Sequence, residues 1–127
     1  MHFVQTDKAP KPVGAYSQAV VVGNLVFISG QIAINPQTGK LEGKTAKEQT
    51  QRVLNNIKAI LSEIGLTEKN IVKTAVYLTD LSNFKEVNEV YGDFFKGLKP
   101  ARETVEVSNL PLGALVEISA IAVIEDV

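Results

Sequence analysis

Residues 115–124 read LVEISAIAVI, and they carry the clearest structural signal in the chain. Alternate positions, from Val116 to Ile124, are all apolar, which is typical of a β-strand that lays one face on a hydrophobic layer. The positions between them mix apolar side chains with Ser119 and Glu117. We therefore expect the uniform face to pack on helices and the mixed face to lie outside that core.

Two further strand-like runs, 16–22 and 25–31, flank Gly23-Asn24, a pair typical of a two-residue β-hairpin turn. A glycine inside the second run, at Gly30, often marks a bulge or a close backbone approach. Strict alternation in that run assigns one face to Val26, Ile28 and Gly30, and the other to Leu25, Phe27, Ser29 and Gln31.

A first helix is predicted to begin after Thr45, which forms a capping-box pattern with Glu48, and to end before Gly65. A second helix is predicted to begin near residues 82–83 and to end at Lys99-Pro100. Their expected apolar faces are Val53, Ile57, Ile60, Leu61 and Ile64 in the first, and Phe84, Val87, Tyr91, Phe94 and Phe95 in the second.

Strands are also expected at 71–79 and 102–107, and a short one near Phe3. The element order is then β-β-β-α-β-α-β-β. This order predicts a single α+β domain over residues 1–127, with two helices packed on one face of a mixed, mostly antiparallel sheet. No linker or internal repeat divides the chain.

Composition excludes several kinds of chemistry. The 127 residues include 13 basic and 14 acidic side chains, no cysteine and one histidine. Disulfides, a thiolate nucleophile and Cys-ligated metals are therefore excluded, and a lone His2 argues against a zinc site or a Ser-His-Asp triad. The balanced charge argues against nucleic-acid binding. No apolar run could span a membrane and no secretory signal is evident, so we expect a cytoplasmic protein.

Glu117 is the only charged residue between Ala114 and Ile124. A carboxylate in an apolar strand is costly unless it is paired, so Glu117 is a candidate acid or base whose pKa is raised by desolvation. The alternative interpretation is an ordinary glutamate on a strand surface.

Arg102 is one of two arginines, and its planar fork suits bidentate capture of a carboxylate or phosphate. It could equally be an exposed charge at a strand end. Alternation places Arg102, Thr104 and Glu106 on one strand face. If that face lies on the same side as Glu117, one site holds a guanidinium and a carboxylate. For Tyr16, Ser29 and Asn88, ordinary strand or helix-surface roles explain the pattern as well as ligand contacts do.

The mixed face of the sheet predicts an interface. In a monomer, four apolar side chains of this face would be exposed to water: Phe27, Leu115, Ile121 and Val123. Apolar patches of this kind usually mark contact surfaces, so we expect a homo-oligomer in which other subunits cover this face.

The order of several motifs resembles the YjgF/RidA family of reactive-intermediate (enamine/imine) deaminases, over essentially the whole chain. The motifs are Gly14-Ala15-Tyr16-Ser17-Gln18-Ala19, Ile28-Ser29-Gly30-Gln31-Ile32, Asn35-Pro36, Thr38-Gly39, Val87-Asn88, Tyr91, Phe94-Phe95, Pro100-Ala101-Arg102, Leu110-Pro111, Val116-Glu117-Ile118 and Ala120-Ile121-Ala122-Val123. The resemblance implies a chorismate-mutase-like fold and a homotrimer around a central barrel, with sites in the clefts between subunits.

The resemblance also implies an activity. The family hydrolyses 2-imino acids and enamines, such as 2-aminoacrylate, 2-iminopropanoate and 2-iminobutanoate, to 2-oxo acids and ammonia, without cofactor or metal. Pyridoxal-phosphate-dependent dehydratases release these intermediates, which implies a metabolic link to such enzymes.

By the same resemblance, Arg102 clamps the substrate carboxylate and Glu117 positions and activates water. The pocket lining is implied to be Tyr16, Ser29, Gly30, Asn88 and Thr104. Thr104 stands where many members have cysteine, Ala15 where proline is usual, and Ser119 where many have a second glutamate. These departures bear on substrate preference.

Other functions remain as alternatives. A non-catalytic regulator that binds 2-oxo acids would use the same arginine. An RNA-directed endoribonuclease or translation inhibitor, as attributed to some relatives, is disfavoured by the charge balance, and a chaperone-like activity leaves no sequence signal. A deaminase is favoured because a pure binder needs Arg102 but has no need of Glu117.

Overall fold

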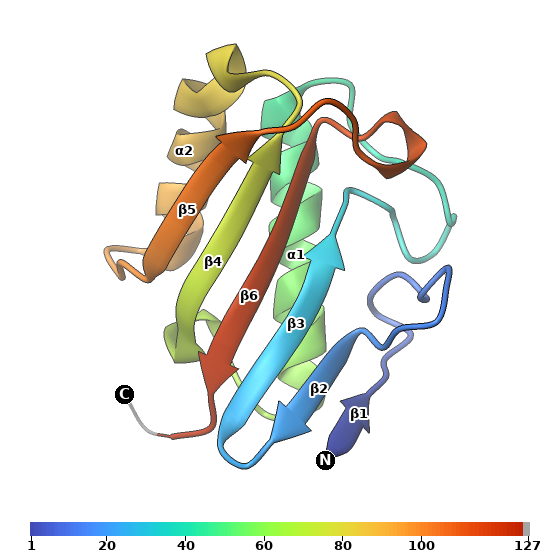
Figure 1. The fold of residues 1–127 in the computed structure, drawn as a ribbon, viewed down its shortest axis with the longest axis vertical. Helices are drawn as coiled ribbons and strands as arrows, with labels where there is room; N and C mark the ends of the chain where they lie inside the picture. The colour runs from blue at the N-terminus through green and yellow to red at the C-terminus, as the bar shows by residue number, and fades with distance from the viewer. Residues whose placement is uncertain (126–127) are drawn as a thin grey trace.

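Two helices lie on one face of a six-stranded β-sheet, and the opposite face is open (Figure 1). This computed structural model describes residues 1–125. The helices are α1 (Ala46–Glu63) and α2 (Phe84–Phe95). The strands are β1 (His2–Val4), β2 (Ala19–Val22), β3 (Leu25–Gln31), β4 (Ile71–Leu78), β5 (Ala101–Glu106) and β6 (Val116–Val123).

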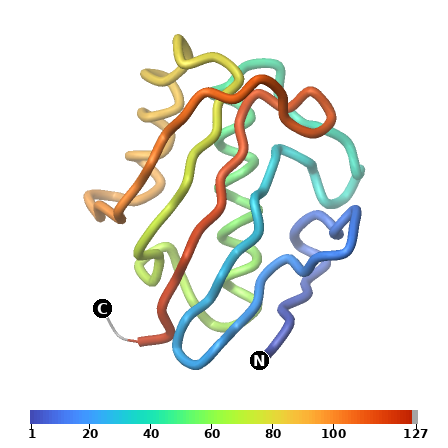
Figure 2. Tube along the Cα trace, in the orientation of Figure 1, coloured from blue at the N-terminus to red at the C-terminus, as the bar shows by residue number. Residues whose placement is uncertain are grey.

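The sheet has the strand order β1-β2-β3-β6-β4-β5, and only β4 and β5 run parallel. The trace in Figure 2 shows the last strand running through the middle of the sheet, between β3 and β4. The predicted α+β architecture, with two helices on one face of a mostly antiparallel sheet, is confirmed. No helix within residues 1–125 has both the length and the apolar character needed to cross a membrane.

The local turn and cap signals are confirmed. Gly23 has a positive φ of 60° in the hairpin between β2 and β3. The Thr45 side chain accepts a hydrogen bond from the Glu48 backbone N–H at 3.1 Å. The Glu48 carboxylate accepts from the Lys44 N–H at 3.3 Å, so the reciprocal half of the capping box is shifted by one residue. Gly65, with φ 74°, follows the end of α1.

Helix α2 ends earlier than predicted. Lys96 and Gly97 adopt left-handed φ angles of 51° and 89°, which terminate the helix at Phe95, well before Pro100. Its buried face also differs from the prediction, because Val90 is buried while Phe84 remains 37% exposed.

Strand β3 contains a β-bulge that reverses the expected facing of its last residues. Ile28 pairs with Ala120, but Gln31 pairs with Ile118, so β3 has one residue more than β6 over this interval. Gln31 therefore turns to the helix side and is buried, whereas Gly30 is exposed on the open side. The prediction from strict alternation, which placed Gly30 on the helix side and Gln31 on the open side, is therefore wrong for these two residues.

The core lies between the sheet and the helices. In β6 the helix-facing side chains are buried and the alternate ones are half-buried, as the pattern predicts. Ile124 is an exception, because it lies beyond the strand and is 42% exposed. On the open face Phe27 is 44% exposed, while Leu115, Ile121 and Val123 are half-buried, so the predicted apolar face is only partly in contact with solvent in a single chain.

Candidate active site

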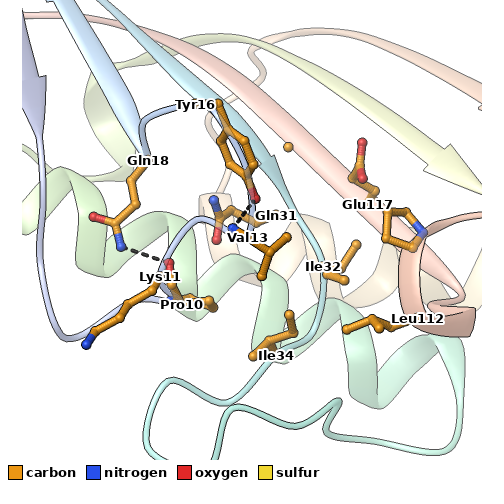
Figure 3. Close-up of a pocket in the computed structure, with 12 residues that line it drawn as sticks. Pro10, Lys11, Val13, Tyr16, Gln18, Gln31, Ile32, Ile34, Leu112 and Glu117 are labelled. Carbon is orange, nitrogen blue, oxygen red and sulfur yellow. Dashed lines mark hydrogen bonds between the residues drawn. The ribbon is translucent and has the colours of Figure 1, made fainter.

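A cavity of about 230 Å³ opens where β3 ends and β6 begins (Figure 3). Glu117 reaches it from β6, Tyr16 from the loop before β2, and Leu112 from the turn Pro111–Gly113. The rest of the wall is largely apolar and includes Val13, Ile32, Ile34 and Pro111. The carboxylate thus stands at the edge of a mostly apolar recess.

Gly30 makes room for the Glu117 carboxylate. A Cβ added at Gly30 would lie 2.6 Å from Oε2 of Glu117 and 2.8 Å from its Cδ. The bulge that turns Gly30 to the open side therefore creates this close approach of backbone and carboxylate. The glycine predicted to mark a bulge or a close approach does both.

Burial raises the pKa of the Glu117 carboxyl above its ordinary value. Desolvation is the cause, and among residues 1–125 no hydrogen bond or opposite charge counters it. A carboxyl group with a raised pKa that lines a recess is a candidate for proton exchange with a ligand or water.

Gln18 anchors the loop that forms the far wall of this cavity. Its buried amide accepts a hydrogen bond from the Thr6 N–H at 2.7 Å and donates to the Thr6 carbonyl at 3.0 Å and the Pro10 carbonyl at 2.9 Å. The loop would otherwise leave these backbone groups unpaired in the interior. The residues next to Gln18 gave no signal for this role, because its partners lie in the loop before it and only Ala19 of the following strand is buried.

Two of the predicted lining residues already have local partners. The Tyr16 hydroxyl accepts a hydrogen bond from the Val13 N–H at 3.3 Å, which holds the ring over the cavity (Figure 3). The Ser29 hydroxyl donates to the Ser17 carbonyl at 2.6 Å. Ser29 therefore ties the loop to β3 in addition to any contact with a ligand.

Arg102 lies on the other side of the sheet. It pairs in register with Thr74, which is buried under the helices, whereas Glu117 pairs with Tyr77 on the open side. Because side chains alternate across a strand, the guanidinium and the carboxylate of one chain face in opposite directions. The condition for a shared site within one chain is therefore not met.

A second recess, of about 490 Å³, surrounds Arg102 between α2, the turn after it and β5. Arg102 donates a hydrogen bond from Nη1 to Oδ1 of Asn88 at 2.8 Å. Thr104 follows on the same strand face, and its buried Oγ1 has no hydrogen-bond partner within the described residues. The two recesses thus divide the predicted residues, with Glu117, Gly30 and Tyr16 in one and Arg102 and Asn88 in the other.

Residues 6–124 match the family model described as Endoribonuclease L-PSP. The chain belongs to the YjgF/RidA family. It is 56% identical over 126 residues to a RutC family protein from Aquifex aeolicus, covering 97% of this chain and 99% of the relative. This confirms the resemblance inferred from the motifs.

Two further relatives carry more specific names. The chloroplastic Reactive Intermediate Deaminase A of Arabidopsis thaliana is 45% identical over 119 residues, which cover 94% of this chain and 64% of the plant protein. The crystal structure of RidA from the Antarctic bacterium Psychrobacter sp. PAMC 21119 has a TM-score of 0.93 at 46% identity, covering 97% of this chain and 99% of that one. The fold is therefore that of solved YjgF/RidA structures.

Within residues 1–125, no three side chains of His, Asp or Glu come close enough together to hold a metal ion. The groups available in the two recesses are a desolvated carboxyl, a guanidinium, hydroxyls and backbone amides. Such a set can orient a small carboxylic acid and move protons.

We predict that Gly30→Ala leaves the fold intact and lowers catalytic activity at least about 10-fold. The reason is that a small displacement of a catalytic group from its productive position lowers the rate strongly. The three atoms nearest to the added methyl group all belong to the Glu117 side chain, so we expect the carboxylate to move while the backbone stays in place. Thermal unfolding and turnover would be measured on the same sample. Gly14→Ala is the matched control, because its Cβ would come no closer than 3.6 Å to the Tyr16 ring. Equal activity of the two variants would contradict the prediction.

Proposed function

We propose that this protein hydrolyses 2-imino acids and their enamine tautomers to 2-oxo acids and ammonia. The observation that carries the proposal is the Glu117 carboxyl, which is desolvated, unpaired among residues 1–125 and placed at the edge of a small, mostly apolar recess. A protein that only binds carboxylic acids would gain nothing from a costly acidic group at this position. The name of the plant relative, a reactive intermediate deaminase, also supports it.

We further propose that the complete site forms between two copies of the chain, within a homotrimer. In one chain Arg102 and Glu117 face opposite sides of the sheet, so a ligand that touches both needs Arg102 from one copy and Glu117 from another. The open face supports this arrangement, because exposed apolar side chains there would be covered by neighbouring copies. Two of these side chains are Phe27, 44% exposed, and Val105, 43% exposed.

The proposed reaction begins when the Arg102 guanidinium binds the substrate carboxylate through paired hydrogen bonds. Glu117 accepts a proton from water as the water oxygen bonds to C2 of the protonated imine, which gives a neutral carbinolamine. The protonated Glu117 then returns this proton to the amino nitrogen. The C–N bond breaks with ammonia as the leaving group, and loss of the hydroxyl proton to ammonia leaves the 2-oxo acid and ammonium.

The decisive experiment generates 2-iminobutanoate in situ with a threonine dehydratase and follows the release of 2-oxobutanoate with and without this protein. We expect the protein to accelerate release well above spontaneous hydrolysis. Release at the spontaneous rate, in a sample that still binds 2-oxobutanoate by calorimetry, would make the protein a 2-oxo-acid binder. Cleavage of a labelled RNA by the same sample, lost in Glu117→Gln, would instead support the ribonuclease named in the family description.

The homotrimer has its own test. We expect light scattering at micromolar concentration to give three times the chain mass of 13.7 kDa. Mixing the impaired Arg102→Lys and Glu117→Gln chains should restore part of the activity, because some interfaces then contain one intact Arg102 and one intact Glu117. A monomeric mass, or no recovery on mixing after subunit exchange, would refute a site shared between copies.

A further inference from the structure

The guanidinium of Arg102 is held by neutral groups. Its Cζ lies 4.7 Å from the centroid of the Tyr91 ring and 5.4 Å from that of the Phe84 ring. Asn88 accepts the hydrogen bond from Nη1 at 2.8 Å. These three contacts come from successive turns of α2, whose spacing places them on one side of the helix.

The ring nearest to Arg102 is itself fixed from inside the core. Tyr91 is buried, and its hydroxyl lies 2.7 Å from Oγ1 of Thr74, which is also buried. Burial raises the pKa of Tyr91, with this hydrogen bond and the charge of Arg102 opposing the rise, so the hydroxyl stays protonated. The Thr74 hydroxyl on β4 therefore fixes the position of the Tyr91 ring, against which the Arg102 guanidinium packs.

The charge of Arg102 stays available to a ligand. Within residues 1–125 the guanidinium makes no ion pair, and the adjacent carboxylate, Glu103, is bound by Lys73 at 3.1 Å on the opposite face of the sheet. Aromatic faces and an amide oxygen orient a guanidinium without neutralising it, whereas a carboxylate partner would compete with the substrate.

We propose that Phe84, Tyr91 and Asn88 are positioning residues, which orient the neighbouring guanidinium for a carboxylate before any ligand arrives. This inference rests on the proposed function, in which Arg102 receives the substrate carboxylate. It changes the role of Asn88 from a lining residue that contacts substrate to one that acts through Arg102. Preorganisation of this kind improves affinity because less freedom is lost on binding.

The first experiment tests the positioning without any assay of activity. The chain has two arginines, Arg52 and Arg102, so the Nε–Hε spectrum of protein labelled with ¹⁵N-arginine contains two signals, assigned with Arg52→Lys. We expect ring currents to shift the Arg102 signal upfield in the free protein. Phe84→Leu should move it toward the position of free arginine, while Arg52 serves as the internal reference. An Arg102 signal that Phe84→Leu leaves in place overturns the proposal.

The second experiment tests the consequence for binding. Phe84→Leu should weaken 2-oxobutanoate binding about 2–5-fold, the range of exposed cation–π contacts, and should raise KM by the same factor with little change in kcat. Asn88→Ala should likewise raise KM with little change in kcat. Tyr91→Phe keeps the ring and should retain affinity despite lower stability. Lys85→Ala, an exposed change on the same helix, is the control and should have no effect.

A double-mutant cycle separates positioning from direct ligand contact or a general effect on the fold. Combined with Arg102→Lys, neither Phe84→Leu nor Asn88→Ala should weaken binding further, because both act through the guanidinium. Full effects in the lysine background would overturn the proposal. If the parent protein neither binds 2-oxobutanoate nor turns over imino acids, the proposed function fails, and the arginine spectrum alone decides the positioning.

Discussion

Replacing Glu117 by glutamine should lower the turnover of 2-imino acids by about 10²–10⁴-fold, the usual range for loss of a general acid–base group. The amide preserves shape and hydrogen bonding but cannot accept the proton of the attacking water. Binding of 2-oxobutanoate should persist, because Arg102 still holds the carboxylate. The proposed trimer should persist too, since a neutral amide costs less to bury than a charge. Coupled turnover and calorimetric binding on one sample would measure both.

The control for this variant is Glu89→Gln, which removes an exposed carboxylate 3.9 Å from Lys47 on the outer side of the helices. It should turn over imino acids like the parent. Unchanged turnover in Glu117→Gln would refute the role given to this carboxyl. Loss of 2-oxobutanoate binding with turnover of bound substrate intact would assign Glu117 to substrate holding instead.

The raised pKa of Glu117 also predicts how stability depends on pH. Between the ordinary and the raised pKa, the folded chain keeps a proton that the unfolded chain has released, so stability falls as pH rises through this window. Glutamine does not titrate. Urea unfolding at a series of pH values should therefore show a smaller loss of stability with rising pH in Glu117→Gln than in the parent. Parallel profiles would show that this carboxyl does not titrate differently on folding.

Replacing Arg102 by lysine should lower kcat/KM by about 10–150-fold, which corresponds to losing a charge-assisted hydrogen bond of about 1.5–3 kcal/mol. Lysine keeps the positive charge but has no planar fork for two parallel hydrogen bonds to a carboxylate. It also lacks the flat surface that rests on the Tyr91 ring, 4.7 Å away. Steady-state kinetics with 2-iminobutanoate would measure the loss.

Arg52→Lys is the matched control, because Arg52 lies on α1, bonds through Nε to Oδ1 of Asn56 at 3.2 Å and lines neither recess. This variant should keep the activity of the parent. If Arg102→Lys turned over imino acids equally well, clamping of the carboxylate by Arg102 would be wrong.

Signals that depend on a few neighbouring residues predicted the fold well. Thr45 and Gly65 mark the ends of α1 because caps are local hydrogen-bond and φ requirements. Gly23 marks the hairpin for the same reason. The predicted end of α2 was wrong, because the helix ends at Phe95, where Lys96 adopts a left-handed conformation. The prediction relied on Pro100 as the helix terminator and did not anticipate a left-handed residue before it.

The candidate site was predicted residue by residue but not as an arrangement. Glu117 stood out because a charge in an apolar strand is costly, and Gly30 because a strand glycine marks a bulge or close approach. Gln18 was missed, since its partners, the Thr6 and Pro10 backbone groups, are 12 and 8 residues away in sequence and become neighbours only when the loop folds back.

The sequence by itself determined the element order, the layer of helices on one face of the sheet, the family and the residues that could carry chemistry, because these follow from period, caps and motifs. Only the tertiary structure decided that Arg102 and Glu117 face opposite sides of the sheet. Alternation fixes the two faces of each strand, but which faces coincide across strands depends on register. The bulge before Gln31 illustrates this dependence, because one extra residue in β3 turns Gln31 to the face opposite to the one that alternation predicts.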